Sequence, residues 1–165
     1  MSADAENYVL DANAFIQAKR RFYGLDFCPG YWQALVWYQR RERLCSIDRV
    51  RDELLRGGDD LSEWVRDQFG NAAFAATSTS EVADVFRQML EWVMAQAQFL
   101  DPAKDGFQHV ADGWLAAFAK AEEFDPVARK KVPLPNVCRA FDVEVITPFE
   151  MLRRLNVKLK WQPPE

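Results

Sequence analysis

The sequence predicts an α/β fold in which helices cover both faces of a parallel sheet. Short apolar runs of strand length alternate along the chain with segments whose apolar residues recur at helical spacing. The chain has 165 residues, of which 49% are hydrophobic and 13% aromatic, and this composition is typical of a globular protein. A chain of this length is expected to form one domain over residues 1–165.

Three short apolar runs in the first half of the chain are predicted strands, and helices separate them. The runs are YVLD (8–11), LCSI (44–47) and NAAFAAT (71–77). Pro29 opens one of the intervening helices, because proline is favoured at the first helical position. Gly57 and Gly58 close another, DRVRDELLRGG (48–58).

The second half of the chain is predicted to be mainly helical, with one further strand. A capping box at residues 78–81 opens a long helix over 82–99, and another helix is expected over about 105–121. VEVIT (143–147) has the clearest strand pattern in the chain. Thr147 and Pro148 then begin a last helix through FEMLRRL, because threonine caps a helix and proline suits its first turn.

Charge and motifs exclude several classes of protein. The net charge of −4 and the pI of about 5.2 exclude a strongly basic surface for passive nucleic-acid binding. The absence of a glycine-rich phosphate loop and of G-x-S-x-G disfavours P-loop kinases, dinucleotide enzymes and serine hydrolases. Four basic clusters have two open interpretations, solvated helix faces or phosphate contacts around an acidic centre. They lie at residues 19–21, 40–43, 129–131 and 153–154.

The cysteines predict neither a zinc site nor a disulfide framework. Cys28, Cys45 and Cys138 are far apart, no C-x-x-C occurs, and His109 is the one histidine. Their apolar neighbours predict free, mostly buried thiols in a cytoplasmic protein. No apolar stretch approaches the roughly 18 residues of a membrane span, so no membrane contact is expected.

Asp11 is the first candidate functional residue. It ends the first predicted strand, and a carboxylate is costly to bury unless something compensates its charge. Ligands of open parallel sheets gather beyond the carboxyl ends of the strands, where Asp11 is expected to lie. Asp11 therefore either caps a turn or holds a cation.

Two further acids have positions that suit a site. Glu53 lies at the border of the apolar face of its helix, whereas Asp52 points outward. Asp112 is flanked on its side of the helix by Ala116 and Ala119, whose small size allows a neighbouring element to approach closely. The alternatives are a surface charge for Glu53 and a cap of the first helical turn for Asp112.

The order of these acids resembles that of the PIN-domain ribonucleases. An aspartate follows the first strand, a glutamate lies in the helix after the second, and a third acid lies in A-D-x-x-L-A-A-x-A. Several longer segments are similar to one uncharacterised bacterial subgroup of that family and cover most of the chain. They are YVLDANAFIQAKRRFYGLDFCPGYW, CSIDRVRDELLRG, ADGWLAAFAKA and KKVPLPNVCRAFDVEVITPFEML.

The resemblance implies a three-layer α/β/α sandwich and a metal-dependent endoribonuclease. Asp11, Glu53 and Asp112 would be catalytic acids that bind Mg²⁺ or Mn²⁺, and Asn13 would hold the first acid or a water. Many bacterial members resemble the toxin half of a type II toxin–antitoxin pair, which implies an RNA substrate, a small antitoxin protein as partner, and in many cases a homodimer.

The sequence departs from the family pattern after the third acid. The family continues into an apolar fourth strand and another acid, but here AFAKA leads at once into EEFDPVARKKVPLPN, so about five apolar residues are missing. The fourth strand is therefore expected to be missing or shortened, and a true deletion would leave a central position of the sheet empty. Glu122 and Glu123 are the two candidates for the fourth acid, and Glu122 is the closer match by its distance to Lys130.

Two other functions remain open at this stage. A PIN-fold module that has lost its fourth acid could bind RNA or a protein partner without catalysis. An α/β partner-binding protein could use its acids only as caps. Convergence of the side-chain oxygens of Asp11, Glu53 and Asp112 would exclude the second of these.

Overall fold

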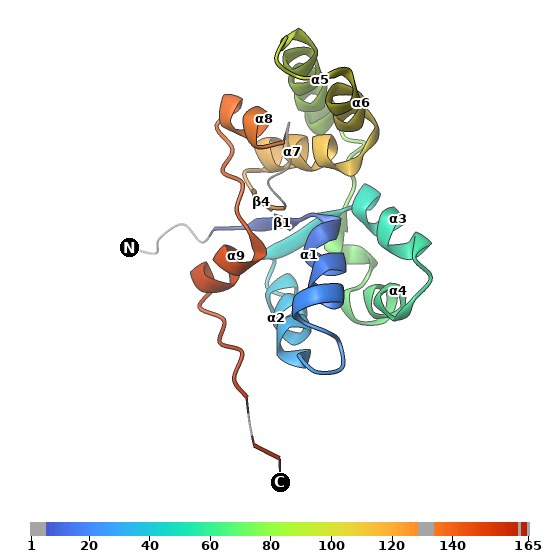
Figure 1. The fold of residues 1–165 in the computed structure, drawn as a ribbon, viewed down its shortest axis with the longest axis vertical. Helices are drawn as coiled ribbons and strands as arrows, with labels where there is room; N and C mark the ends of the chain where they lie inside the picture. Colours follow the sequence, from blue (N-terminus) through green and yellow to red (C-terminus); the bar gives the residue numbers. More distant parts are fainter. Residues whose placement is uncertain (1–5, 129–133, 162, 165) are drawn as a thin grey trace.

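The structure, a computed structural model, describes residues 6–128, 134–161 and 163–164. Four parallel strands form a sheet in the order β3-β2-β1-β4, and helices cover both of its faces (Figure 1). The strands are β1 (Tyr8–Leu10), β2 (Leu44–Ile47), β3 (Phe74–Ala75) and β4 (Asp125–Val127). The predicted three-layer α/β/α architecture around a parallel sheet is confirmed.

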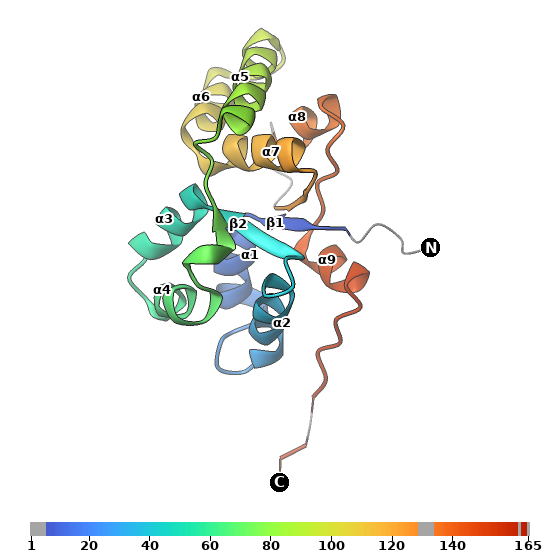
Figure 2. The same ribbon diagram turned by 180° about the vertical axis from the view of Figure 1, so that it is seen from behind.

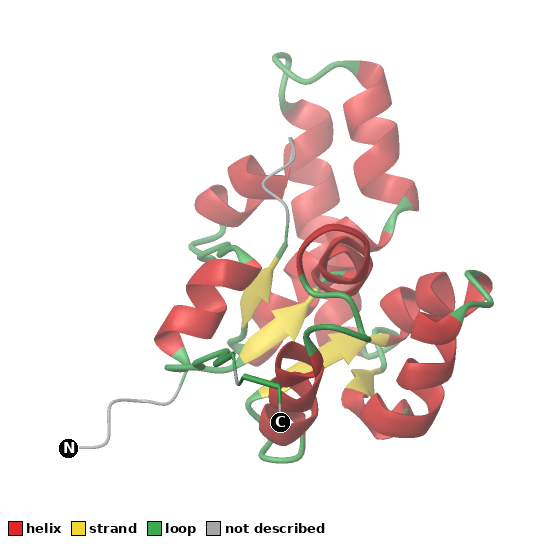
Figure 3. Ribbon diagram, turned by 60° about the horizontal axis from the view of Figure 1, so that its bottom comes forward, coloured by secondary structure: helices red, strands yellow, loops and turns green. Residues whose placement is uncertain are grey.

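The helices divide into two layers, with the strands between them (Figures 2 and 3). The upper layer of Figure 1 consists of α5 (Ser80–Ala95), α6 (Asp101–His109), α7 (Ala111–Glu122) and α8 (Leu134–Ala140). The lower layer contains α1 (Ala12–Gln17), its continuation η1 (Ala18–Phe22), α2 (Pro29–Gln39), α4 (Asp60–Trp64) and α9 (Pro148–Arg154). Helix α3 (Asp48–Arg56) follows β2 and contacts both layers, through α1 and α7. Segments η2 (Val65–Phe69) and η3 (Asn71–Ala73) connect α4 to β3.

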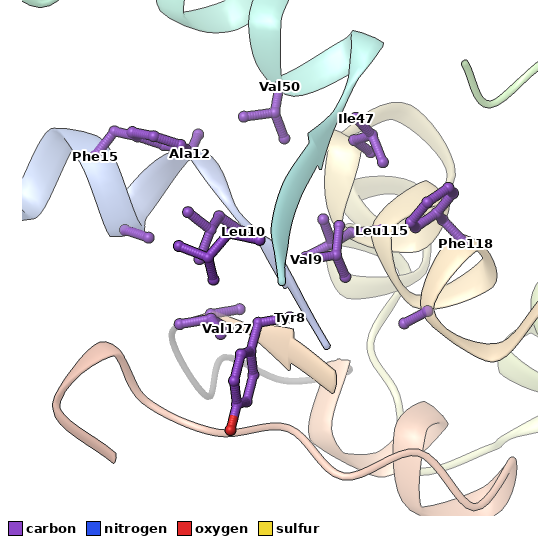
Figure 4. Close-up of a cluster of buried hydrophobic side chains, with 14 of the residues drawn as sticks. Tyr8, Val9, Leu10, Ala12, Phe15, Ile47, Val50, Leu115, Phe118 and Val127 are labelled. Carbon is purple, nitrogen blue, oxygen red and sulfur yellow. The ribbon is translucent and has the colours of Figure 1, made fainter. Parts of the chain in front are cut away.

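Strand β1 lies between β2 and β4, and all three of its side chains are buried. Val9 lies on the face of the sheet that meets Leu115 of α7 (Figure 4). Leu10 lies on the opposite face, toward Phe15 of α1. A strand that is buried on both faces has a continuous apolar sequence rather than an alternating one, which is why YVL was recognisable as a strand.

The fourth strand is present but short. Its three residues pair with β1 in the register Tyr8↔Asp125, Val9↔Pro126 and Leu10↔Val127. Of the two expected alternatives, a missing or a shortened fourth strand, the structure shows the shortened strand. The empty position that a true deletion would have left does not occur, because DPV fills the place beside β1.

The prediction of a strand over residues 143–147 is wrong, and β4 explains why. Only Ile146 forms a bridge, to Val127 of β4. Its backbone N–H donates to the Pro126 carbonyl (3.0 Å), and its own carbonyl accepts from the Ala128 N–H (3.1 Å). Alternate residues of a strand direct their backbone groups to the same side, so Pro126 and Ala128 both face residues 143–147. Proline has no N–H, so Pro126 cannot donate a hydrogen bond to that segment. A three-residue partner with one donor missing cannot support a longer ladder.

Two other predicted elements differ in extent. The strand expected over NAAFAAT is reduced to Phe74–Ala75, because η3 occupies its first residues. The single helix expected over about 105–121 is broken at Val110, which has extended dihedral angles (φ −105°, ψ 166°). The break makes Ala111 the first residue of α7, which places Asp112 in the first turn of that helix.

Gly113 permits the close packing of α7 on the end of α6. A Cβ at this position would lie 2.7 Å from the Phe107 carbonyl oxygen and 2.9 Å from a ring carbon of Phe86. Both distances are shorter than a carbon atom tolerates. The absence of a side chain at Gly113 therefore sets how closely the two helices meet at the residue beside Asp112.

The cysteines and the membrane prediction can be checked directly. Cys28, Cys45 and Cys138 are all free; Cys138 is buried and the other two are partly buried. The predicted absence of disulfides is confirmed. Among the residues that the structure describes, no helix combines the length and the apolar character needed to cross a bilayer.

Replacement of Gly113 tests the α6–α7 packing. Gly113→Ala should lower the free energy of unfolding by about 1–3 kcal/mol, because the added methyl group overpacks a contact with backbone. The matched control is Gly106→Ala in α6, where a Cβ would meet nothing within 4 Å. This control should raise the stability by about 0.5–1 kcal/mol, because alanine is the better helix former. Urea denaturation followed by circular dichroism measures both, and equal effects of the two substitutions would contradict the packing argument.

Candidate acidic site

Asp11 directly follows β1 and is held in place through the backbone. Its N–H donates to the Val127 carbonyl of β4 (3.0 Å). The carbonyl of the preceding residue, Leu10, accepts a hydrogen bond of 2.6 Å from the buried Ser46 hydroxyl of β2. Both neighbouring strands therefore fix the position from which the Asp11 side chain projects.

The Asp11 carboxylate is buried but does not act as a helix cap. The residue is 4% exposed and precedes α1, yet its side chain makes no capping hydrogen bond to that helix. It accepts instead a hydrogen bond of 3.1 Å from the side-chain amide of Asn13. The capping alternative for Asp11 therefore lacks the hydrogen bond that it requires.

Glu53 reaches toward the same region from α3. Its side chain lines a small cavity of about 60 Å³ between α3 and η1, together with Arg20. Desolvation raises the pKa of Glu53, and the negative charge of Asp112 raises it further. Glu53 is thus an exposed side chain at the mouth of this cavity, and it is close enough to Asp112 for the two charges to interact.

Asp112 lies in the first turn of α7 and is partly buried. The residue that caps α7 is Val110, and it provides no side-chain cap, so Asp112 is not the cap itself. A negative charge in the first turn interacts favourably with the helix dipole. The same charge acts on both Asp11 and Glu53, which places Asp112 at the edge of the sheet where they lie.

The three acids share one electrostatic neighbourhood at the carboxyl edge of the sheet. The pKa of Asp11 is raised from 3.8 to about 7, first by burial and then by the negative charge of Asp112, with a smaller contribution from Glu53. The strongest charges that act on the Asp11 carboxylate are thus both negative. Helices α1 and α7 lie in the two layers on opposite faces of the sheet, and α3 contacts both of them (Figure 1).

The acids approach one another without forming a ready-made metal centre. Over residues 6–128 and 134–161, no three His, Cys, Asp or Glu side chains stand close enough together to hold an ion. The expected convergence of three carboxylates is therefore not present in this arrangement. The donor chemistry nevertheless fits a hard divalent cation, because all three ligands offer oxygen and their mutual repulsion would be relieved by positive charge.

Glu122 does not belong to this site. It is the last residue of α7, ten residues beyond Asp112, which corresponds to about 15 Å along the helix. Its negative charge instead acts on the Cys45 thiol of β2, whose pKa is raised mainly by burial. The sequence has no acidic residue between Asp125 and Asp142, so the segment after β4 offers no substitute.

Some residues of the basic clusters form ion pairs with carboxylates of the same chain, and others do not. Lys19 forms ion pairs with Asp59 and Asp60, and Arg154 pairs with Glu144 and Glu150. These two cations are therefore engaged in ion pairs within the chain, which neither solvated helix faces nor phosphate contacts had predicted. Arg21 differs, because it has no carboxylate partner within the described part of the chain and lines a separate pocket. The cluster at 129–131 lies outside the described residues.

That pocket is the feature that sequence reasoning missed. It has a volume of about 210 Å³ and lies between the α1–η1 segment and the start of α9, with Asn13 at its border. One wall of the pocket could have been predicted from the spacing of Asn13, Gln17 and Arg21. These residues recur at every fourth position and therefore share one helix face. The opposite wall, from Pro148 and Phe149, is more than a hundred residues away and left no local signal.

Comparison with known proteins yields one match. A family model described as a domain of unknown function (DUF4411) matches residues 8–159. No curated protein and no solved structure matches the chain.

The raised pKa of Asp11 predicts a pH dependence of stability in metal-free protein. Between about pH 4 and pH 7 the folded state binds more protons than the unfolded state, so stability falls as the pH rises through this window. The loss is complete above pH 7 and amounts to about 4 kcal/mol. Asp11→Asn removes the titrating group and should therefore become increasingly more stable than the wild type across this range.

Melting scans in EDTA at several pH values measure the difference. The control is Asp52→Asn in the exposed part of α3, which should follow the wild-type profile. A constant difference between Asp11→Asn and the wild type from pH 4 to pH 8 would show that the Asp11 carboxylate is not under electrostatic strain.

Proposed function

The chain belongs to the DUF4411 family, and we propose that it is a metal-dependent endoribonuclease of the PIN type. Its substrate would be RNA, and its cofactor Mg²⁺ or Mn²⁺ held by Asp11, Glu53 and Asp112. The biological part of the proposal is that the protein is the toxin of a type II pair, with a small antitoxin as partner and a homodimer as its assembly. That part rests on the resemblance of the sequence to PIN-domain toxins.

One observation carries the enzymatic proposal. Asp11 is 4% exposed at the end of the innermost strand, and the charges of two other acids from two other helices act on it. An arrangement that raises the pKa of a carboxylate by burial and then by like charges is unfavourable for folding and typical of functional sites. A divalent cation reverses the sign of this interaction, because each carboxylate then faces a positive charge.

The chemistry of the site follows from the roles of its own residues. Asp11 would bind from a fixed position, because two strands hold its backbone. Asn13 would keep the carboxylate oriented through its hydrogen bond. Glu53 and Asp112 would bind after rotating toward Asp11. The bound cation would neutralise charge on the scissile phosphate and lower the pKa of a water molecule for attack.

A second function is favoured by a specific observation. The described residues contain no converged group of three acids, and Glu122 lies at the far end of α7. A module of PIN type that lacks its fourth acid would bind RNA or a protein partner through the same surface without cleaving RNA. Binding of metal alone does not distinguish the two functions, whereas cleavage does.

Removal of the Asp11 charge tests the metal site. Millimolar Mn²⁺ should raise the melting temperature of the wild type, because ligands that bind only the folded state stabilise it by about 2.7 kcal/mol at one hundred times the Kd. Asp11→Asn should melt at the same temperature as the wild type or higher without metal, and should lose the metal-induced rise. Ribonuclease activity should fall by several orders of magnitude.

Matched variants sharpen this experiment. Glu53→Gln should also lose the response to Mn²⁺, whereas Asp52→Asn, one residue away on the same helix, should retain it. Glu122→Gln should likewise retain it, since Glu122 lies away from the site. An equal rise in melting temperature for the wild type and Asp11→Asn would show that Asp11 is no ligand and would remove the main support for a nuclease.

A further inference from the structure

The pocket beside Asn13 is built from two segments that are distant in sequence. One wall comes from the α1–η1 segment, where Ala14 and Ala18 leave space because their side chains are short. The other wall comes from Pro148 and Phe149 at the start of α9. Its volume of about 210 Å³ is below the roughly 300–1,000 Å³ of sites for drug-sized ligands, so it suits a single ring system.

Aromatic rings form the rim and the floor of this pocket. Phe22 and Phe149 are 49% and 40% exposed, and their ring centroids are 5.3 Å apart in an edge-to-face arrangement. Below them, Tyr23 stacks on the buried Tyr31 at 4.6 Å, and the Tyr31 hydroxyl donates to the Ala14 carbonyl (2.7 Å). The floor is therefore rigid, while the rim presents exposed π-surface to a ligand.

Polar groups line the pocket in a row along one helix face. Asn13, Gln17 and Arg21 recur at every fourth residue, so their side chains succeed one another from the acidic site outward. Two amides can recognise hydrogen-bonding edges, and Arg21 supplies a positive charge at the exposed end. This combination of a stacking surface, amides and a cation matches a base attached to a phosphate.

The position of the pocket in the sheet is an independent argument. From β1 the chain adds β2 and β3 on one side of the sheet and then returns to add β4 on the other side, so the topological switch point lies between β1 and β4. The crevice at such a switch point is the usual ligand site of an open parallel sheet. Asn13 follows β1 closely, Ala128 directly follows β4, and Thr147 follows the bridging residue Ile146. All three line the pocket.

We propose that this pocket binds one nucleobase of a single-stranded RNA beside the acidic site. Phe149 stacks on the base, and Phe22, whose ring is nearly perpendicular to that of Phe149, contacts the base edge-on. Gln17 contacts the hydrogen-bonding edge of the base, and Arg21 contacts an adjoining phosphate. The proposal rests on the proposed function in that it takes RNA as the ligand. Asn13 connects the two sites, because it lines the pocket and hydrogen-bonds to Asp11. A base held here would bring the adjoining phosphate toward Asp11.

Binding to two oligomers that differ only in their bases tests the proposal. The probes are a fluorescein-labelled oligoadenylate and an abasic oligomer of the same length, measured by fluorescence anisotropy in EDTA so that no cleavage occurs. Phe149→Ala should weaken binding of the oligoadenylate about 5- to 150-fold, the range of one stacked base, and should leave binding of the abasic oligomer unchanged. Arg21→Gln should weaken both, because it acts on the phosphate.

Two further variants separate stacking from damage to the fold. Phe149→Trp keeps an aromatic face and should bind the oligoadenylate at least as well as the wild type. Phe27→Ala removes a phenylalanine that is 72% exposed outside the pocket and should change neither affinity. Melting scans accompany each variant. Equal loss on both oligomers with Phe149→Ala, or no loss on either, would overturn the base site.

The outcomes distinguish this proposal from the nuclease proposal. A wild-type protein that binds the oligoadenylate through Phe149 but never cleaves RNA with Mn²⁺ supports the base site and contradicts the nuclease. A protein that cleaves RNA while Phe149→Ala binds and cleaves like the wild type contradicts the base site alone. Failure of the wild type to prefer the oligoadenylate over the abasic oligomer overturns the base site, and a pocket that takes a partner's side chain would give that result.

Discussion

The burial of Asp11 at the end of β1 is the constraint on which the site depends. Strand β1 lies between two parallel neighbours and is covered on both faces, so the chain leaves it at a fixed point in the protein interior. The backbone of Asp11 is bonded to β4, and the residue before it to Ser46 of β2. These bonds fix the backbone from which the carboxylate projects, and the carboxylate itself accepts a hydrogen bond from Asn13. The apolar core of the whole domain therefore offsets the cost of a buried charge.

The same constraint bears on why the three acids interact electrostatically without forming a group that could hold an ion. Asp11 is buried and its backbone is hydrogen-bonded to β4, whereas Glu53 projects from a helix that contacts both layers and Asp112 from the first turn of α7. The position of Asp112 depends in turn on the break at Val110 and on Gly113, which lets α7 approach the end of α6. Repulsion among like charges favours separated side chains in the absence of a cation. The arrangement thus resembles a site whose final closure depends on the ligand that removes the repulsion.

The sequence predicted the parts that local patterns determine and missed those that depend on distant contacts. The apolar run before Asp11 marked a buried strand, and the phase of Glu53 on its helix marked a residue at the border of the core. The pattern of residues 143–147 was equally strong, yet they form a single bridge, because their partner β4 has three residues and carries Pro126. The position of Glu122 away from the site follows from the length of the predicted helix, because ten helical residues separate it from Asp112. The pocket wall at Phe149 could not be predicted from the sequence, because only the fold brings Phe149 next to α1 and η1.

The shortened β4 shapes both the acidic site and the neighbouring pocket. A longer fourth strand would project further at the carboxyl edge and could carry a fourth acid, but here the strand ends at Val127 and Ala128 lines the pocket. The bridge at Ile146 then brings the start of α9, with Thr147 and Phe149, next to α1. One side of the switch point thus holds buried negative charge, and the other holds aromatic rings with the cation of Arg21. A phosphodiester with an attached base has the chemistry that complements both sides, provided that a cation screens the acids from the phosphate.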